Sequence, residues 1–107
     1  MFLINENEKI NENDIFYIEL NKQYNQILIY SSFERIDIKL NDEDYKNLVI
    51  RLSDLVLSKD NLVWEYNYII NFNKVYHYTM NSNNISIIWN EKTNNNVPTF
   101  LVIDGEI

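Results

Sequence analysis

Four carboxylates lie close together near the start of the chain, where their spacing could serve chemistry or binding. They are Glu6, Glu8, Glu12 and Asp14. Clustered carboxylates can hold a divalent cation, act as general acid and base, or meet the cationic groups of a partner. Their spacing does not match that of a calcium-binding loop. Such a loop also needs a glycine at its turn, and the only glycine of the chain, Gly105, lies far from this group. We therefore expect no metal here and interpret the group either as a solvated loop or as a partner-binding surface.

The single histidine, His77, is the other residue that could carry catalysis. An active imidazole needs neighbours that orient it and tune its pKa, and Glu65 is the best neighbour in the predicted sheet. A zinc site normally takes about four His, Cys or carboxylate ligands, and the chain has no cysteine. We therefore expect no catalytic residue, no cofactor and no metal, and a protein that is not an enzyme. The lack of cysteine is typical of a reducing cytoplasm.

The aromatic residues of the second half admit two interpretations. A platform for stacking nucleic-acid bases is interleaved with basic residues, whereas here only Lys74 lies nearby. The preferred interpretation is a hydrophobic core, and the alternative is a groove for a peptide or partner. The predicted core consists of Trp64, Tyr66, Tyr76, Tyr78 and Trp89.

The composition limits the classes of protein further. The length of 107 residues predicts a single domain over 1–107. Because the chain has only one Gly and one Pro, it cannot form a glycine-rich phosphate-binding loop. A net charge of −7 with nine scattered basic residues argues against direct nucleic-acid binding. We expect neither a signal peptide nor a membrane span, because the apolar stretches are too short.

One amphipathic helix is predicted from the spacing of apolar residues over 41–59. Tyr45, Leu48 and Leu52 belong to a stripe that would face a core. Asn41 or Asp42 can cap the start, and the acidic residues that follow are stabilised by the helix dipole. The acidic group at 42–44 is thus explained by structure alone.

The rest of the chain alternates as strands, with no internal repeat expected. Strands are predicted at 15–20, 26–33, 35–40, 62–70, 74–80, 84–90 and 99–104, with a further short strand at 2–5. Hairpin connections are expected at 21–25 and 71–73, and a loop at 94–96. A turn at 71–73 would pair Tyr68 with Tyr76, Tyr66 with Tyr78 and Trp64 with Met80. A turn at 81–84 would put Ile85, Ile87 and Trp89 on the same face.

Together these elements predict an α+β fold, with an antiparallel sheet of about six or seven strands and the helix packed across its aromatic face. The preferred function is a non-enzymatic inhibitor of a basic, nucleic-acid-handling protein such as a nuclease or CRISPR effector. A phage anti-defence protein and a toxin immunity protein both fit this description. Its predicted contacts are Glu6, Glu8, Glu12, Asp14 and Glu65, because an acidic surface steers toward basic partners.

Two other classes of function remain open from the sequence. One is a small-ligand-binding protein or an enzyme that acts on a nucleotide or a sugar, for which a deep pocket with convergent polar groups would be the sign. The other is a self-assembling structural module, for which an exposed sheet edge or an apolar dimer patch would be the sign.

Overall fold

A computed structural model describes residues 1–91 and 97–105 of the chain, which form one α-helix and ten strands in three antiparallel sheets. The largest sheet has the order β5-β4-β3-β7-β6, and a smaller one has the order β10-β9-β8. The third is the hairpin β1-β2. The α+β class is confirmed, whereas the prediction of one sheet with six or seven strands is wrong.

The bounds of the elements follow the chain from one sheet to the next. The N-terminal hairpin and the first three strands of the large sheet are β1 (Phe2–Asn5), β2 (Glu8–Ile10), β3 (Ile15–Asn21), β4 (Gln26–Ser31) and β5 (Arg35–Lys39). After α1 (Asp42–Ser58) come β6 (Leu62–Glu65), β7 (Tyr68–Asn71), β8 (Val75–Met80), β9 (Asn84–Trp89) and β10 (Phe100–Asp104). The short 3-10 helices are η1 (Glu12–Asp14), η2 (Lys22–Tyr24) and η3 (Phe72–Lys74).

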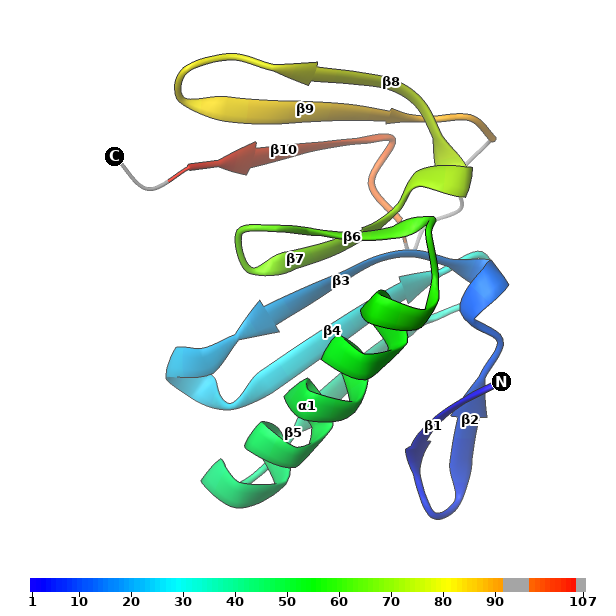
Figure 1. Ribbon diagram of the computed structural model, residues 1–107, viewed down its shortest axis with the longest axis vertical. Helices are drawn as coiled ribbons and strands as arrows, with labels where there is room; N and C mark the ends of the chain where they lie inside the picture. Colours follow the sequence, from blue (N-terminus) through cyan, green and yellow to red (C-terminus); the bar gives the residue numbers. More distant parts are fainter. Residues whose placement is uncertain (92–96, 106–107) are drawn as a thin grey trace.

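The five-stranded sheet is covered on both faces, so the protein has three layers (Figure 1). Helix α1 packs on the aliphatic face, where Leu48 and Leu52 join Ile18, Ile27 and Ile29 in one core. The three-stranded sheet packs on the opposite face and forms the second, more aromatic core. The predicted packing of the helix on the aromatic face is therefore wrong.

The helix itself begins and buries its side chains as its sequence predicts. The side chain of Asn41 caps it by accepting a hydrogen bond from the backbone N–H of Asp44 at 2.8 Å. Its buried residues are Tyr45, Leu48 and Leu52, which recur on one helical face. Capping, dipole and apolar stripe all agree here, which explains why this element could be predicted from sequence.

The segment predicted as one strand over 62–70 is in fact the hairpin of β6 and β7. The chain reverses at Tyr66, whose φ of 55° is a left-handed conformation that is uncommon for a tyrosine. Alternating apolar residues continue through this turn, so periodicity alone does not reveal it. As a result Tyr68 pairs with Glu65 and Glu19, and not with Tyr76.

The connection predicted as a hairpin at 71–73 instead carries the chain from one sheet to the other through η3. Strand β8 pairs with β9, so the predicted pairs of Tyr66 with Tyr78 and of Trp64 with Met80 do not exist. Of the five predicted aromatic core residues only Trp89 is buried, while Tyr78 is half-buried. The turn at 81–84 and the inward face of Ile85, Ile87 and Trp89 are confirmed. The loop predicted at 94–96 lies outside the described residues.

An internal repeat, which was not predicted from the sequence, relates the two halves of the structure. Each half consists of a hairpin, a 3-10 turn and a three-stranded meander: β1-β2, η1 and β3-β4-β5 in the first, β6-β7, η3 and β8-β9-β10 in the second. Asn11 caps η1 by accepting from the N–H of Asn13 at 3.0 Å, and Asn71 caps η3 by accepting from Asn73 at 3.0 Å. Along the chain, helix α1 lies between the two copies.

The two copies also share an irregularity in their strands. The β3-β4 ladder has a register shift between Ile15 and Tyr17, and the β8-β9 ladder has one between Val75 and His77. Ile15 and Val75 are as far apart in the sequence as Asn11 and Asn71, and so are Tyr17 and His77. Few equivalent positions in the two copies carry the same residue, which is why the repeat is visible in the structure and not in the sequence.

Candidate functional site

The N-terminal hairpin is held against α1 by one arginine. The guanidinium of Arg51 donates a hydrogen bond from Nη2 to the carbonyl of Ile4 at 2.9 Å and another to the carbonyl of Leu3. It also lies over the ring of Phe2, 5.7 Å from the ring centroid. The positive charge of Arg51 is thus directed at the hairpin backbone.

A groove of about 650 Å³ lies between the hairpin and α1. Glu6 lines it from the β1-β2 turn and Asp44 from the first turn of the helix, and both side chains are exposed. Apolar residues of β5 and α1, including Ile38 and Leu48, also line it, as does Arg51, whose guanidinium is engaged by the hairpin backbone. The groove therefore offers carboxylates on both walls and apolar surface between them, a combination that suits the cationic head and aliphatic stem of Lys or Arg.

Glu8 extends the acidic surface along the hairpin. It is exposed on β2, and its Oε1 accepts a hydrogen bond from the amide of Asn5 at 3.3 Å. Asp42 and Glu43 are exposed beside Asp44 in the first helical turn. The structure thus brings Glu6 to the same groove as Asp44 of the helix start. This pair was not predicted from the sequence, because the acidic residues 42–44 were explained by capping and the helix dipole alone.

Glu12 is drawn into ion pairs within the chain. Its Oε2 lies 3.2 Å from the N-terminal ammonium, and its Oε1 lies 3.7 Å from Nζ of Lys59. A backbone hydrogen bond lowers the pKa of Glu12 below its usual value; partial burial opposes this change, and the positive N-terminus and Lys59 reinforce it. A carboxylate that is already paired has less to offer a partner, so the geometry favours a structural role for Glu12.

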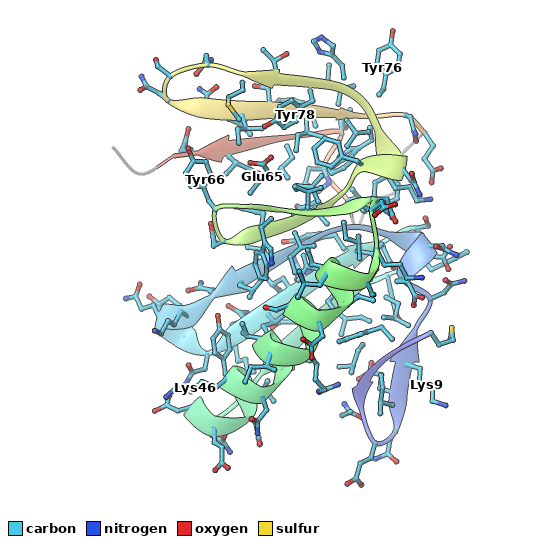
Figure 2. All side chains as sticks on the ribbon, in the orientation of Figure 1. Lys9, Lys46, Glu65, Tyr66, Tyr76 and Tyr78 are labelled. Carbon is cyan, nitrogen blue, oxygen red and sulfur yellow. The ribbon has the colours of Figure 1, made fainter. Side chains whose placement is uncertain are left out.

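Asp14 and Glu65 also lie apart from the groove. Asp14 is half-buried at the end of η1, where its backbone carbonyl accepts from the N–H of Ser32 at 2.9 Å. Glu65 lies at the end of β6 and accepts a hydrogen bond from the hydroxyl of Tyr78 at 3.2 Å. Figure 2 shows Glu65 and Tyr78 near the strands of the three-stranded sheet, far from Lys9 on the hairpin. The five predicted contact residues therefore do not form one surface.

His77 is exposed on the outer face of β8, in a sheet that does not contain the strand of Glu65. Its Nδ1 lies 3.4 Å from the hydroxyl of Thr79. The expected neighbourhood of His77 and Glu65 is wrong, because it assumed that β7 pairs with β8. Within the described residues, no group of three or more His, Cys, Asp or Glu side chains is arranged to hold a metal ion.

A group of tyrosines around Glu19 is a second polar feature that the sequence did not indicate. Tyr17 stacks on Tyr30 with ring centroids 4.2 Å apart, and Tyr68 lies beside Tyr17 at 6.0 Å. Burial raises the pKa of the Glu19 carboxyl, and burial followed by the influence of Tyr30 raises that of Tyr17. The unbroken apolar run over 15–18 in β3 is the signal that could have revealed it, because a strand buried on both faces reads as a continuous hydrophobic run.

A second cavity, of about 630 Å³, lies on another side of α1. Two exposed lysines, Lys22 and Lys46, line it together with Tyr45 and Ile50. Asp42 also lines it, but its carboxylate accepts a hydrogen bond from the amide of Asn25. The cavity therefore combines cationic and apolar groups, the reverse of the groove beside the hairpin.

No known family model matches the chain, and no curated protein or solved structure is significantly similar to it. No helix among the described residues is long and apolar enough to cross a membrane. The function must therefore be inferred from the geometry of the surfaces.

Proposed function

We propose that this chain is a non-enzymatic, acidic binding protein that neutralises a basic partner protein. The observation that carries the proposal is the position of Glu6 and Asp44 on facing sides of one groove, with the exposed Glu8 and Glu43 close by in sequence. The proposed contact residues differ from those predicted from the sequence. Glu12 and Glu65 are left out because they interact within the chain, and Asp44 is added because it lines the groove.

The groove suits a loop or helix that presents Lys or Arg. A cationic side chain could lay its apolar stem on Ile38 and Leu48 while its head meets Glu6 or Asp44. The net charge of −7 would attract a basic surface over about a Debye length, ~10 Å at 0.1 M salt. Such steering raises the association rate more than it raises the final affinity.

The partner class follows from the sign of the charge. Proteins that handle nucleic acid carry basic surfaces for phosphate, and a rigid acidic surface can occupy them. A nuclease or a CRISPR effector is the proposed target, with the chain acting as a phage anti-defence inhibitor or as the immunity protein of a toxin. Neither role requires catalytic residues, metal or cofactor in this chain.

The test uses two variants that change net charge equally. Glu6→Lys with Asp44→Lys reverses the groove, while Glu34→Lys with Asp60→Lys reverses two exposed carboxylates elsewhere. Each tagged protein is used to capture partners from the source organism, and the captured protein is identified and assayed for its activity on nucleic acid. The proposal expects the wild type and the Glu34/Asp60 variant to capture and inhibit the same basic protein, and the groove variant to fail. Equal inhibition by all three would contradict it.

The cavity beside Lys22 and Lys46 supports a second candidate, the binding of a small anionic ligand such as a nucleotide. The two ammonium groups could meet phosphate while Tyr45 and Ile50 contact an apolar or aromatic moiety. Calorimetric titration with ATP, compared between the wild type and Lys22→Gln with Lys46→Gln, tests this directly. Binding that is lost in the double variant would favour the ligand function, and no binding at millimolar ATP would remove it.

A further inference from the structure

Strand β8 is the least protected sheet edge in the described part of the chain. It has six residues, Val75–Met80, and none of them is Lys, Arg, Asp, Glu or Pro. The other edges are short or charged: β5 carries Arg35, Asp37 and Lys39, β6 ends at Glu65, β10 ends at Asp104, and β1 and β2 have four and three residues. Proteins normally shield edges with charge, proline or short strands, so an unshielded edge is typical of a pairing site.

The internal repeat shows what covers the corresponding edge in the first half. Strand β3 corresponds to β8, and its two sides are paired with β4 and with the hairpin strand β7. Ile18 pairs with Ile69 in this ladder, and the N–H of Leu20 donates to the carbonyl of Asn67 at 2.8 Å. Strand β8 has β9 on one side, as β3 has β4, and no strand among the described residues takes the place of β7.

The backbone of β8 offers hydrogen-bonding groups toward this open side. The N–H of Asn81 donates to the carbonyl of Asn84 at 3.0 Å, which sets the alternation of the β8-β9 ladder. In an antiparallel pair every second residue directs its N–H and C=O away from the neighbour. Tyr78 and Met80 are those residues, and they correspond to Ile18 and Leu20, which pair with β7. Met80 is 61% exposed.

The negative charge of Glu65 beside this edge indicates which side chain a strand paired with β8 would carry. The carboxylate of Glu65 lies 3.2 Å from the Tyr78 hydroxyl, and it takes part in none of the ion pairs between described residues (Figure 2). A side chain directly opposite Tyr78 would lie on the same face of the sheet as Tyr78 and hence next to Glu65. A Lys or Arg at that position would supply the missing opposite charge.

We propose that the open edge of β8 binds an extended segment of a partner protein, antiparallel to β8, with a Lys or Arg opposite Tyr78. The segment occupies the position that β7 occupies on β3. This surface lies in the second half of the chain and is separate from the acidic groove, so either site can be occupied without the other.

The probe is a capped synthetic peptide with the sequence of residues 66–71, which includes β7, carrying Ile69→Lys. In the register of β7 on β3 this lysine falls opposite Tyr78. Titration into the ¹⁵N-labelled full chain is followed by NMR and amide hydrogen exchange. We expect a dissociation constant below about 1 mM and slowed exchange at the amides of Tyr78 and Met80. The same peptide with Glu in place of Lys should bind about 5-fold more weakly.

Two controls separate edge pairing from other contacts. Methylation of the peptide nitrogen at the lysine removes the donor that would pair with the Tyr78 carbonyl, so it should abolish binding without any change to the protein. Met80→Pro should do the same from the protein side, while Met80→Ala should keep binding because the backbone donor remains. Circular dichroism verifies that each variant is folded.

Three outcomes would overturn the proposal. The first is no binding of the lysine peptide at 1 mM, and the second is binding that survives the nitrogen methylation. The third is concentration-dependent protection of the Tyr78 and Met80 amides in the free protein, because a second copy of the chain would then occupy the edge.

Discussion

The rings of Tyr17 and Trp89 lie parallel, with centroids 5.7 Å apart and planes inclined by 5°. Tyr17 belongs to β3 of the first half, and Trp89 belongs to β9 of the second. Phe16 makes an edge-to-face contact with the same indole, with ring centroids 5.3 Å apart. Offset and edge-to-face contacts of this kind add about 0.5–1.5 kcal/mol each beyond burial. The contact therefore joins the two copies of the repeat face to face.

Replacing this indole should weaken the whole structure. Trp89→Ala is expected to lower the free energy of unfolding by about 3–5 kcal/mol, because Trp89 is only 5% exposed and its removal leaves a cavity between the sheets. Tyr76→Ala is the matched control: that ring is 77% exposed, so the change should stay within about 0.5 kcal/mol. Urea denaturation measures both, and equal losses would contradict the described core.

The core beneath the helix gives an independent prediction. Leu52→Ala should lower the free energy of unfolding by about 2–5 kcal/mol, because Leu52 is 0% exposed and packs among the aliphatic residues of the large sheet. A loss below about 1 kcal/mol in urea denaturation would mean that the helix does not bury this face.

The elements that sequence predicted are those in which local signals agree. Helix α1 has its cap, acidic first turn and apolar stripe in one place, and the turn at 81–84 lies between two strands of clear alternation. The β6-β7 hairpin was missed because Tyr66 turns the chain where its neighbours still alternate. The second sheet was missed because strand patterns do not say which sheet a strand joins, and the turn at Asn71 leads to a new layer.

The candidate site was predicted only in part, for a similar reason. The acidity of the hairpin was visible in the sequence, but the neighbourhood of Glu6 and Asp44 depends on how the hairpin folds back on α1 through Arg51. Glu65 is drawn to Tyr78 because β6 and β8 belong to different sheets that face each other. Such long-range packing leaves no trace in residue spacing.

The pH dependence of stability should reveal the role of Glu12. Its pKa is lowered from the ordinary value of 4.5, so its stabilising effect is complete above that value and is lost as the pH falls through the folded-state pKa. Glu12→Gln should therefore reduce the free energy of unfolding at pH 7 by about 1 kcal/mol and make little difference in strong acid. A loss that is the same at both pH values would contradict the ion pairs.

Glu19 provides the opposite case for comparison. Burial raises its pKa, so the charged form costs stability above the folded-state pKa and the cost disappears as the carboxyl is protonated. Glu19→Gln should increase the free energy of unfolding at pH 7, with a gain that shrinks as the pH falls. Chemical denaturation of the two variants at several pH values should give differences of opposite sign from the wild type.

The exposed imidazole should be dispensable. His77→Gln is expected to leave the fold, and the affinity of the groove for its partner, within about 0.5 kcal/mol of the wild type, because its one described polar neighbour is Thr79. Binding measurements and thermal unfolding check this. Loss of biological activity with unchanged folding and unchanged affinity would instead indicate an enzyme.

The central claim is that the acidic groove recruits a basic protein surface, and the salt dependence of the association rate tests it most directly. The rate constants for the captured partner are measured by stopped flow from about 50 mM to about 500 mM salt, for the wild type, the Glu6/Asp44 reversal and the Glu34/Asp60 reversal. The account predicts a steep fall of the wild-type association rate with salt, a smaller change in dissociation, and a markedly slower association for the groove variant than for its control. An association rate that is indifferent to salt, or equally slow in both variants, would contradict the account.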